Sequence, residues 1–439
     1  MGLLSEAINR GFSRRTFLKG AGSLAAAPLL TGLGGTLLTG CSSDSKASTG
    51  PDEFNTKLVI LGSSGGVGYW PASDRASSSS ALVVNGAIYL IDLGQGATYR
   101  LNQAFNTTSL VDADDNYIFP ASSTFLGDIK ALFFTHLHQD HLADYANLLL
   151  IGAGSNLGKP TSDSKGWATS PLQVIGPCDR GQLDMNNNPF WSNEWVISTD
   201  SSNPSGITST PGTIQMTDLI LQAFAQAEND LMMDDGYPNY QSLVAVREIG
   251  TGLASPDSPT CPTTTPFQIY PEGGGEDENG VSVQATLVDH RQVYPSFAYR
   301  FDTPDGSVVF SGDTGPNTTA DRDVPEGDPS LAHGNLQVLA DGADILVHEV
   351  IDTAWINVKF ADTNLAALKT HMLNAHTQIE RVGQVAAYCN VKTLVINHII
   401  PGMAPIEHLR QAQRNFPGKL IISEDLMRIG VSKAGSAVL

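Results

Sequence analysis

The sequence predicts an α/β fold in which strands and helices alternate and pack in layers. Short apolar runs bounded by glycine or polar turns indicate strands. From Val281 to the C-terminus, such runs alternate with segments of helical spacing. The expected strands span residues 57–61, 81–84, 87–92, 129–134, 282–288, 297–301, 307–310, 345–347, 393–396 and 419–423, and the expected helices span 142–151, 216–233, 331–340, 377–389 and 405–415.

Two glycine-containing turns shape the start of this fold. An Asn-Gly pair joins the runs 81–84 and 87–92, which predicts a hairpin with a tight turn. The first strand ends in Gly62-Ser-Ser-Gly-Gly66. No Gly-Lys-Ser/Thr ending and no helical pattern follow these glycines, which argues against a phosphate-binding loop of the P-loop type.

The composition is that of a globular protein with a strongly acidic balance. Hydrophobic residues make up 41% of the 439 residues, and 25 basic residues stand against 45 acidic ones. Phosphate backbones bind Lys and Arg, so this surface is poorly suited to nucleic acid. Between residues 181 and 280, fourteen acidic residues accompany one basic residue, Arg247. We expect the range of about 180–280 to form an acidic, partly helical insertion on the core.

The first 40 residues have the features of an export signal. Arg14 and Arg15 precede a mildly apolar stretch at 20–40, whereas a membrane anchor needs about 20 strongly apolar residues. The arginine pair resembles a twin-arginine signal, whose export route carries folded proteins. Leu38-Thr-Gly-Cys41 resembles a bacterial lipobox, which implies a lipid on Cys41 and a place in the cell envelope on the periplasmic side. Residues 41–56 then form a flexible tether, and 57–439 form the folded domain.

Three further cysteines remain for the folded domain. They are Cys178, Cys261 and Cys389, and an odd number cannot all pair within one chain. One disulfide is compatible with an oxidising compartment, and the sequence does not choose its partners. Cys389 lies in a helical run and is expected to be a small core residue.

A cluster of metal-ligand side chains follows the expected strand at 129–134. His136, His138, Asp140 and His141 fall within six residues, although the chain has only 10 histidines. Imidazole and carboxylate are ligands that suit Zn²⁺ and similar ions. In an extended segment, His136 and His138 point to the same side, and the next turn can direct Asp140 and His141 to a second position. The competing interpretation is a polar loop with scattered histidines, which the crowding of three into one hexapeptide disfavours.

The motif His-x-His-x-Asp-His after a strand resembles the signature of the metallo-β-lactamase superfamily, and the resemblance runs from about 57 to 432. Further motifs resemble the branch that contains tRNA 3′-processing endonucleases and related arylsulfatase-like and phosphodiesterase-like hydrolases. The matching segments are Leu61-Gly-Ser-Ser-Gly-Gly66, Asp92-Leu-Gly-Gln-Gly96, Val288-Asp-His290, Ser296-Phe-Ala-Tyr-Arg300, Gly312-Asp-Thr314, Val347-His-Glu349, Ala375-His-Thr377 and Val395-Ile-Asn-His398. One departure is Gln139, where many relatives have glycine.

The resemblance implies a four-layer αββα sandwich with two metal sites. One ion would be bound by His136, His138 and His290, the other by Asp140, His141 and His398, and Asp313 would bridge them. Two Zn²⁺ ions are expected, with Mn²⁺ or iron as alternatives.

The resemblance also implies catalytic roles for three residues. Asp140 would orient the attacking water, His376 would act as a general acid, and Glu349 would orient His376. The alternative for His376 is a surface residue at the start of the helix at 377–389. We expect a structural role for His348 and surface positions for His333, His371 and His408.

Together these features predict an exported di-zinc hydrolase that cleaves small phosphodiesters or sulfate esters by metal-activated hydroxide. A lactonase or β-lactamase-like hydrolase is the second enzyme class, because fold alone does not decide function. A non-catalytic, metal-binding lipoprotein is the alternative outside enzymes, and a redox di-iron site is also conceivable. The expected partners are a small ester, the membrane through the lipid on Cys41, and further copies of the chain in a homo-oligomer, with no nucleic acid.

Overall fold

The computed structural model describes residues 54–118, 122–160, 167–180, 211–253, 261–291, 293–316, 334–362 and 365–439. All of them belong to the compact unit Thr49–Leu439. The expected signal at 1–40, Cys41 and His333 lie outside the described residues. No helix in the described ranges is long and apolar enough to cross a bilayer.

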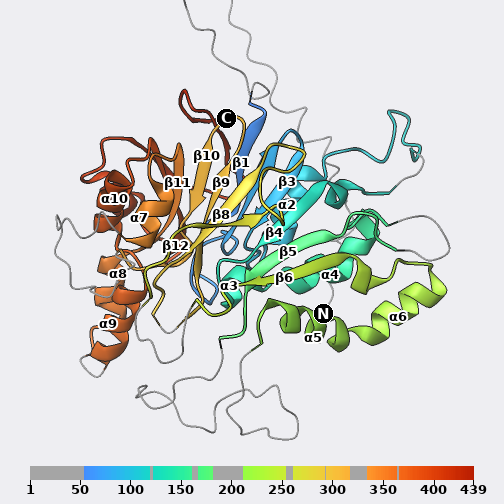
Figure 1. Ribbon diagram of the computed structural model, residues 1–439, viewed down its shortest axis with the longest axis horizontal. Coiled ribbons are helices and arrows are strands. Elements are labelled where there is room, and N and C mark those ends of the chain that lie inside the picture. The colour runs from blue at the N-terminus through green and yellow to red at the C-terminus, as the bar shows by residue number, and fades with distance from the viewer. Residues whose placement is uncertain are drawn as a thin grey trace, which may run out of the picture. The chain divides into compact units, whose positions relative to one another are not determined.

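Two mixed sheets form the centre of this unit (Figure 1). The first has eight strands in the order β15 (Ala437–Val438), β14 (Arg428–Gly430), β1 (Thr56–Gly62), β2 (Ser79–Val84), β3 (Ala87–Ile91), β4 (Ile129–Phe133), β5 (Leu172–Pro177) and β6 (Val244–Ile249). The second has seven in the order β13 (Lys419–Ile422), β12 (Thr393–Ile400), β11 (Ile345–Ile351), β10 (Ser307–Phe310), β9 (Phe297–Asp302), β8 (Ser282–Leu287) and β7 (Phe267–Tyr270).

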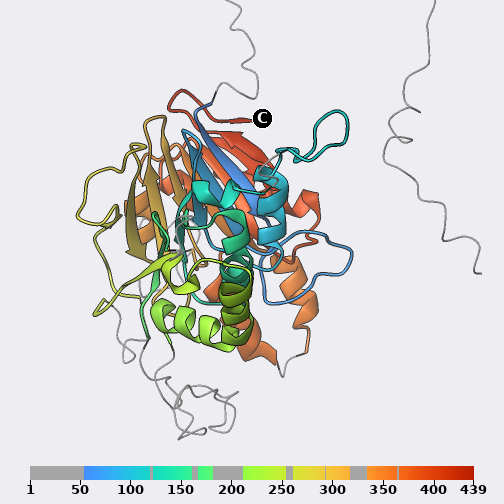
Figure 2. The same cartoon turned by 90° about the vertical axis from the view of Figure 1, so that its right-hand side faces the viewer.

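Helices cover the outer face of each sheet, as the two views in Figures 1 and 2 show. The first sheet is covered by α2 (Ala97–Phe105), α4 (Tyr145–Gly152), α5 (Thr213–Ala223) and α6 (Ala225–Asp234). The second is covered by α7 (Asn335–Ala340), α10 (Ile379–Tyr388) and α11 (Ile406–Leu409). Beside them, α8 (Thr353–Lys359) and α9 (Ala366–Ala375) enclose a smaller apolar cluster.

Apolar side chains fill all three spaces between these four layers. Between the sheets, Tyr89 and Phe133 of the first sheet share a cluster with Tyr299 and Val347 of the second. Separate clusters lie between each sheet and its helices. Because burial of apolar surface drives these layers together, the order helix–sheet–sheet–helix follows from the alternation of apolar residues along each strand. The predicted αββα sandwich is therefore confirmed.

Each sheet has a block of parallel strands, and these blocks position the functional side chains. In the first sheet β3, β4, β5 and β6 are parallel neighbours. In the second, β10, β11, β12 and β13 are parallel neighbours. Since the carboxyl ends of parallel strands meet at one edge, residues that follow these strands are brought together there.

The predicted hairpin is confirmed by the pairing of β2 with β3. Asn85 and Gly86 turn the chain with φ of 51° and 87°, the left-handed conformation that an Asn-Gly turn of this type needs. The helix expected at 216–233 is instead the pair α5 and α6, which meet at Phe224. This bend allows Met216 of α5 and Met232 of α6 to pack against the same apolar cluster.

Part of the range 180–280 differs from the expected insertion because it belongs to the two sheets. β6 extends the first sheet beyond β5, and β7 is the edge strand of the second. The sequence pattern missed β6 because most of its side chains are only half-buried, so no continuous apolar run marks the strand. Other elements that were not predicted include the strands β5, β14 and β15 and the helices α2, α8 and α9.

The three cysteines of the described chain are free thiols. Cys389 is buried among apolar residues of the second sheet's helical layer, as its position in a helical run predicted. No disulfide joins Cys178 to Cys261 in the described ranges.

Candidate metal centre

The predicted ligand residues lie at the ends of strands from both sheets. His136 and His138 follow β4, and Asp140 and His141 begin the short helix α3 (Gln139–Leu142). The remaining ligand-type residues come from the second sheet: His290 follows β8, Asp313 follows β10 and His398 lies within β12. The structure thus brings together residues that are up to 262 positions apart in the sequence.

The first ligand group consists of His136, His138, His290 and Asp313. Their candidate ligand atoms all lie within 4.8 Å of one another. Nδ1 of His138 is 3.1 Å from Nε2 of His136 and 3.4 Å from Nε2 of His290. Nε2 of His136 and Nε2 of His290 are each 3.8 Å from Oδ2 of Asp313. This spacing, with nitrogen lone pairs converging on one carboxylate, is compatible with a cation between them.

The second ligand group consists of Asp140, His141, Asp313 and His398. Oδ1 of Asp313 is 3.3 Å from Nε2 of His141 and 3.2 Å from Nε2 of His398. Nε2 of His398 is also 3.2 Å from Oδ2 of Asp140. Asp313 therefore faces one group with each of its carboxylate oxygens.

The donor atoms fit metal ions because several are buried without a hydrogen bond. Oδ1 of Asp140, Oδ1 of Asp313 and Nε2 of His141 have no hydrogen-bond partner within the described part of the chain. An unsatisfied buried polar group costs about 1–3 kcal/mol, so a cluster of them is unfavourable unless another group binds there. Divalent cations at the two groups would satisfy these atoms and neutralise the carboxylates.

Burial and charge set the protonation states around the two groups. Burial lowers the pKa of His136, His138 and His290 below the ordinary histidine value, which keeps the neutral imidazole that metals require. Burial also disfavours a charged His141, but the carboxylates of Asp313, Asp92 and Asp140 outweigh it and raise its pKa. A cation in the second group would replace that proton as the charge that balances the carboxylates.

Asp92 is a functional residue to which the sequence analysis assigned no role. Its Oδ2 lies 2.8 Å from Nδ1 of His141, and its Oδ1 accepts a hydrogen bond of 2.8 Å from the backbone N–H of Thr135. A carboxylate that accepts from Nδ1–H leaves the lone pair on Nε2, the atom that faces Asp313. The motif Asp92-Leu-Gly-Gln-Gly96 was the available signal. A Cβ on Gly94 would lie 2.1 Å from the carbonyl oxygen of Asp140, so only glycine fits beneath the ligand loop.

The glycine loop after β1 contacts the second ligand group. The backbone N–H of Gly66 donates a hydrogen bond of 2.7 Å to Oδ2 of Asp140. A Cβ on Gly65 would lie 2.3 Å from the ring of His398. Only glycine lets the backbone of this loop come so close to Asp140 and His398. This contact explains why the loop is rich in glycine although it is not a P-loop.

His376 and Glu349 form a buried pair beside the ligand groups. Nδ1 of His376 lies 3.3 Å from Oε1 of Glu349, and the same oxygen accepts hydrogen bonds from the backbone N–H groups of Thr314 and Thr377. Burial disfavours the imidazolium, but Glu349 outweighs it and raises the pKa of His376 to about 9. His376 is buried at the C-terminal end of α9, so the alternative of a surface residue is wrong.

The remaining histidines lie away from the ligand groups or contribute to packing. His348 is fully buried in β11, and its Nδ1 lies 2.7 Å from the backbone oxygen of Glu349, in agreement with a structural role. His371 is half-buried rather than exposed. His408 pairs with Asp352 at 2.7 Å. Gln139 is exposed at the start of α3, so it replaces glycine without entering the ligand groups.

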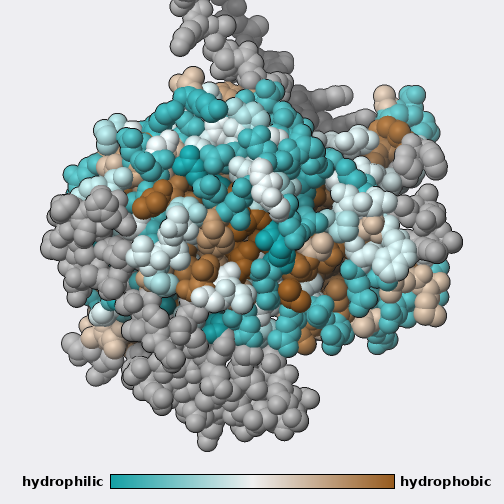
Figure 3. Space-filling view, in the orientation of Figure 1, coloured by the Kyte–Doolittle hydropathy of each residue, from teal (hydrophilic) through white to brown (hydrophobic). Residues whose placement is uncertain are grey.

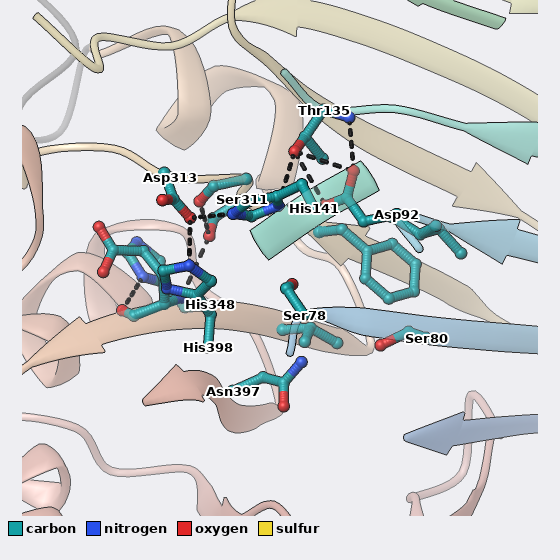
Figure 4. A pocket seen from close by; sticks show the side chains of 15 residues that line it. Ser78, Ser80, Asp92, Thr135, His141, Ser311, Asp313, His348, Asn397 and His398 are labelled. Carbon is teal, nitrogen blue, oxygen red and sulfur yellow. Dashed lines mark hydrogen bonds and ion pairs between the residues drawn. The ribbon is translucent and has the colours of Figure 1, made fainter. Parts of the chain in front are cut away.

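A small cavity lies on the inner side of the second ligand group, between the two sheets (Figure 4). Its volume is about 30 Å³, and its walls include His141, Asp313 and His398 together with Ser78 and Asn397. Ile91, Phe310 and Val347 also line it, so the ligand side chains face a wall of mixed polar and apolar groups on the interior side.

The comparisons with known proteins agree with this architecture. Residues 11–31 match the model of the twin-arginine translocation pathway signal sequence, which supports export by that route. The chain is 24% identical over 383 residues to "Ribonuclease Z" of Mycobacterium sp. (strain KMS), covering 85% of this chain and 96% of that protein. It is 24% identical over 379 residues to "Ribonuclease Z" of Mycobacterium marinum, covering 85% of this chain and 98% of that one.

Two solved structures are similar at lower identity. The short form of human tRNase Z has 16% identity and a TM-score of 0.46, covering 85% of this chain and 99% of that one. The metallo-beta-lactamase fold protein YhfI from Bacillus subtilis has 14% identity and a TM-score of 0.44, covering 85% and 98% of the two chains.

The sequence similarity to the ribonuclease Z proteins spans nearly their whole length and includes both sheets with their strand-end ligands. The αββα layers and the two histidine–aspartate groups are what such a relationship requires. The similarity to these proteins and the two groups of ligand side chains support a metal-dependent hydrolase that resembles ribonuclease Z.

Proposed function

We propose that the protein is an exported di-zinc hydrolase of small ester-type substrates, either phosphodiesters or sulfate esters. The observation that carries the proposal is the carboxylate of Asp313, whose two oxygens face two separate ligand groups. Histidine and carboxylate donors suit zinc, while Mn²⁺ and iron are compatible with the same donors. Bound there, two cations would polarise an ester oxygen and lower the pKa of water toward neutrality.

Asp140 is placed to orient the attacking water. Its Oδ2 is held by the N–H of Gly66 and by Nε2 of His398, whereas Oδ1 is buried and has no hydrogen-bond partner among the residues that the structure describes. A carboxylate fixed through one oxygen keeps the other in a defined direction, and that oxygen can accept a proton or a hydrogen bond from water. We infer that Asp140 serves both as a ligand and as the group that positions the nucleophile.

His376 is placed to donate a proton to the leaving group. Glu349 engages Nδ1, so Nε2 is the ring nitrogen left for a substrate oxygen. Glu349 is itself fixed by the N–H groups of Thr314 and Thr377, and it therefore holds the ring in one orientation. Alkoxide leaving groups depend on such a proton, because they are expelled slowly without it.

The relatives are named Ribonuclease Z, yet three properties of this chain favour a small substrate over tRNA. Its net charge is −20, and its region 181–280 holds fourteen acidic residues and one basic residue. RNA binding normally depends on basic surface. The twin-arginine signal directs the protein away from cytoplasmic RNA. The face in Figure 3 shows apolar side chains near its centre bordered by hydrophilic ones.

We further propose that Cys41 carries a lipid that holds the protein in the cell envelope, on the periplasmic side, with residues 41–56 as a tether. The support is the Leu38-Thr-Gly-Cys41 sequence after the signal. Assembly into a homo-oligomer is part of the same proposal. Mass spectrometry of the membrane-associated protein tests the lipid, and light scattering tests the assembly.

A substrate panel on zinc-loaded protein tests the proposed activity. It contains a phosphodiester, an aryl sulfate, a lactone, a cephalosporin and a precursor tRNA, with metal content measured on the same sample. We expect turnover of the phosphodiester or the sulfate, and loss of that turnover in Asp313→Ala. Asp114→Ala, which changes an exposed aspartate far from the ligand groups in sequence, is the matched control.

Three other results of the substrate panel would contradict the proposed function. Turnover of the lactone or cephalosporin alone would support the second enzyme class. Cleavage of the precursor tRNA alone would assign the activity named for the relatives. Fewer than about one metal per chain, with no turnover, would support the non-catalytic alternative.

A further inference from the structure

A pocket of about 270 Å³ lies at the carboxyl ends of β5 and β6 and takes no part in the chemistry described above. It is lined by Cys178 and Arg180 after β5, by Glu248 and Thr251 around the end of β6, and by Tyr294 and Pro295. The last two residues belong to the segment that leads from His290 into β9. The pocket is therefore built at the strand edge that also presents the metal ligands.

The sheet register places this pocket close to the first ligand group. β4, β5 and β6 are consecutive neighbours, and adjacent strands are about 4.8 Å apart. The carboxyl ends of β5 and β6 thus lie roughly 5–10 Å from the end of β4, where His136 follows. The N–H of Phe297, two residues after Pro295, donates to the carbonyl of Thr135 at 2.9 Å and ties this segment to the ligand loop.

Arg180 is the one basic side chain among the residues that line the pocket. Its guanidinium lies over the ring of Tyr294, 4.9 Å from the centroid. Its Nε is buried and makes no hydrogen bond within the described residues. Burial lowers the pKa of the guanidinium from its usual value, although arginine stays charged at any physiological pH. The structure thus holds a partly dehydrated cation whose orientation is fixed by an aromatic ring.

The carboxylate of Glu248 does not neutralise Arg180. Oε1 of Glu248 accepts a hydrogen bond of 2.9 Å from the backbone N–H of Ile214 at the start of α5. Asp179 is exposed at the rim of the pocket. The carboxylate of Glu248 is thus directed toward α5, and it forms no ion pair with Arg180 among the described residues. The guanidinium also forms a hydrogen bond with Tyr294, which leaves its buried Nε–H unsatisfied among the described residues. A planar guanidinium with such an unsatisfied N–H is suited to a carboxylate, sulfate or phosphate.

We propose that Arg180 binds a second anionic group of the substrate, separated from the scissile ester by a spacer of about 5–10 Å. This inference rests on the proposed function, because it describes the part of an ester substrate that does not react. The substrate class is accordingly an ester with an acidic tail. Arg180 would act in binding and orientation, since the reacting ester itself must lie at the metal ligands.

Two matched substrates test this inference on zinc-loaded protein. They are carboxyhexyl 4-nitrophenyl phosphate and its hexyl counterpart, which differ only in the terminal carboxylate. We expect Arg180→Gln to raise KM for the carboxyhexyl ester by about 10- to 100-fold, the range for a lost charge-assisted hydrogen bond, with kcat and the hexyl ester unchanged. Arg180→Lys should recover part of the loss, and Arg410→Gln, at an exposed arginine on the far helical layer, should behave as wild type.

An equal effect of Arg180→Gln on both esters, or no effect, would overturn the inference and leave Arg180 a packing residue. If the wild type cleaves neither ester, the phosphodiesterase part of the proposed function has failed, and the pocket is then tested by binding alone. Calorimetry with carboxyhexylphosphonate and hexylphosphonate serves this purpose. Tighter binding of the carboxylate-bearing ligand that is lost in Arg180→Gln supports the inference, and equal binding of both ligands to wild type refutes it.

Discussion

Asp92→Asn tests whether the hydrogen bond between Asp92 and Nδ1 of His141 fixes the tautomer of this metal-ligand histidine. Asp92 accepts hydrogen bonds from the N–H of Thr135 and from Nδ1 of His141, each at 2.8 Å. Asparagine keeps the shape but presents an N–H₂ group toward one of these donors. If that group faces His141, the ring must carry its proton on Nε2, the nitrogen that faces Asp313. The ring could then no longer bind a cation.

The expected cost is a 10- to 100-fold weaker second metal, which is typical when the partner of a ligating histidine is removed. At 1.36 kcal/mol per tenfold change, this equals roughly 1.4–2.7 kcal/mol of binding free energy. The assay is a competition titration of the metal-free protein against a chromogenic chelator. It should show one site unchanged and one weakened, because Asp92 contacts His141 and not the first ligand group.

Asp144→Asn is the matched control. Asp144 is also buried, and its Oδ2 accepts hydrogen bonds of 2.8 and 2.7 Å from the N–H and hydroxyl of Thr98. Its substitution should lower the free energy of unfolding without changing either metal affinity. Metal binding of Asp92→Asn within twofold of wild type, in protein that circular dichroism shows to be folded, would refute the tautomer argument.

Three further perturbations address other parts of the centre. Gly65→Ala places a methyl group against the ring of His398 and should remove the second metal, as measured by metal analysis, whereas Gly68→Ala, whose Cβ meets nothing within 4 Å, should bind metal as wild type. His376→Ala should slow esters with alkyl leaving groups at least about tenfold more than nitrophenyl esters, since a good leaving group needs no proton; an equal effect, or the same pattern in the His408→Ala control, would argue against a general acid. Chelation should lower the melting temperature by several degrees, because it exposes the unsatisfied buried carboxylates and histidines, and a melting temperature unaffected by zinc would contradict metal binding in the folded state.

Ligand residues that are close together in the sequence could be predicted from their spacing, whereas ligand residues that are far apart could not. His136 to His141 are close in the chain, so their spacing alone indicated a metal site. His290, Asp313 and His398 are isolated, and no local pattern shows that β8, β10 and β12 end at the same edge as β4; only the family resemblance selected them. Asp92 had no assigned role because its partner, His141, lies 49 residues later.

Two of the missed strands and one misjudged helix share a physical cause, although the missed strand β5 is buried along most of its length and does not. The strand β6 is half-buried along most of its length, and β7 has only four residues, so neither has the apolar periodicity of a central strand. The break between α5 and α6 at Phe224 is set by packing onto the first sheet, because no proline or glycine marks it. Tertiary contacts decided these features, and local composition carried no signal for them.

Each ligand group draws residues from both sheets, and this has a consequence for how the protein acquires its ions. Neither sheet alone supplies a complete set of ligands, so the two sheets must pack together before an ion can contact all of its ligands. A folded metal site selects among metals by the geometry of its ligands, and the metal that binds also depends on which ions are available when the site forms. If the chain is exported in the folded state, as its twin-arginine signal leads us to expect, any metal it binds would be selected in the compartment of synthesis, before export.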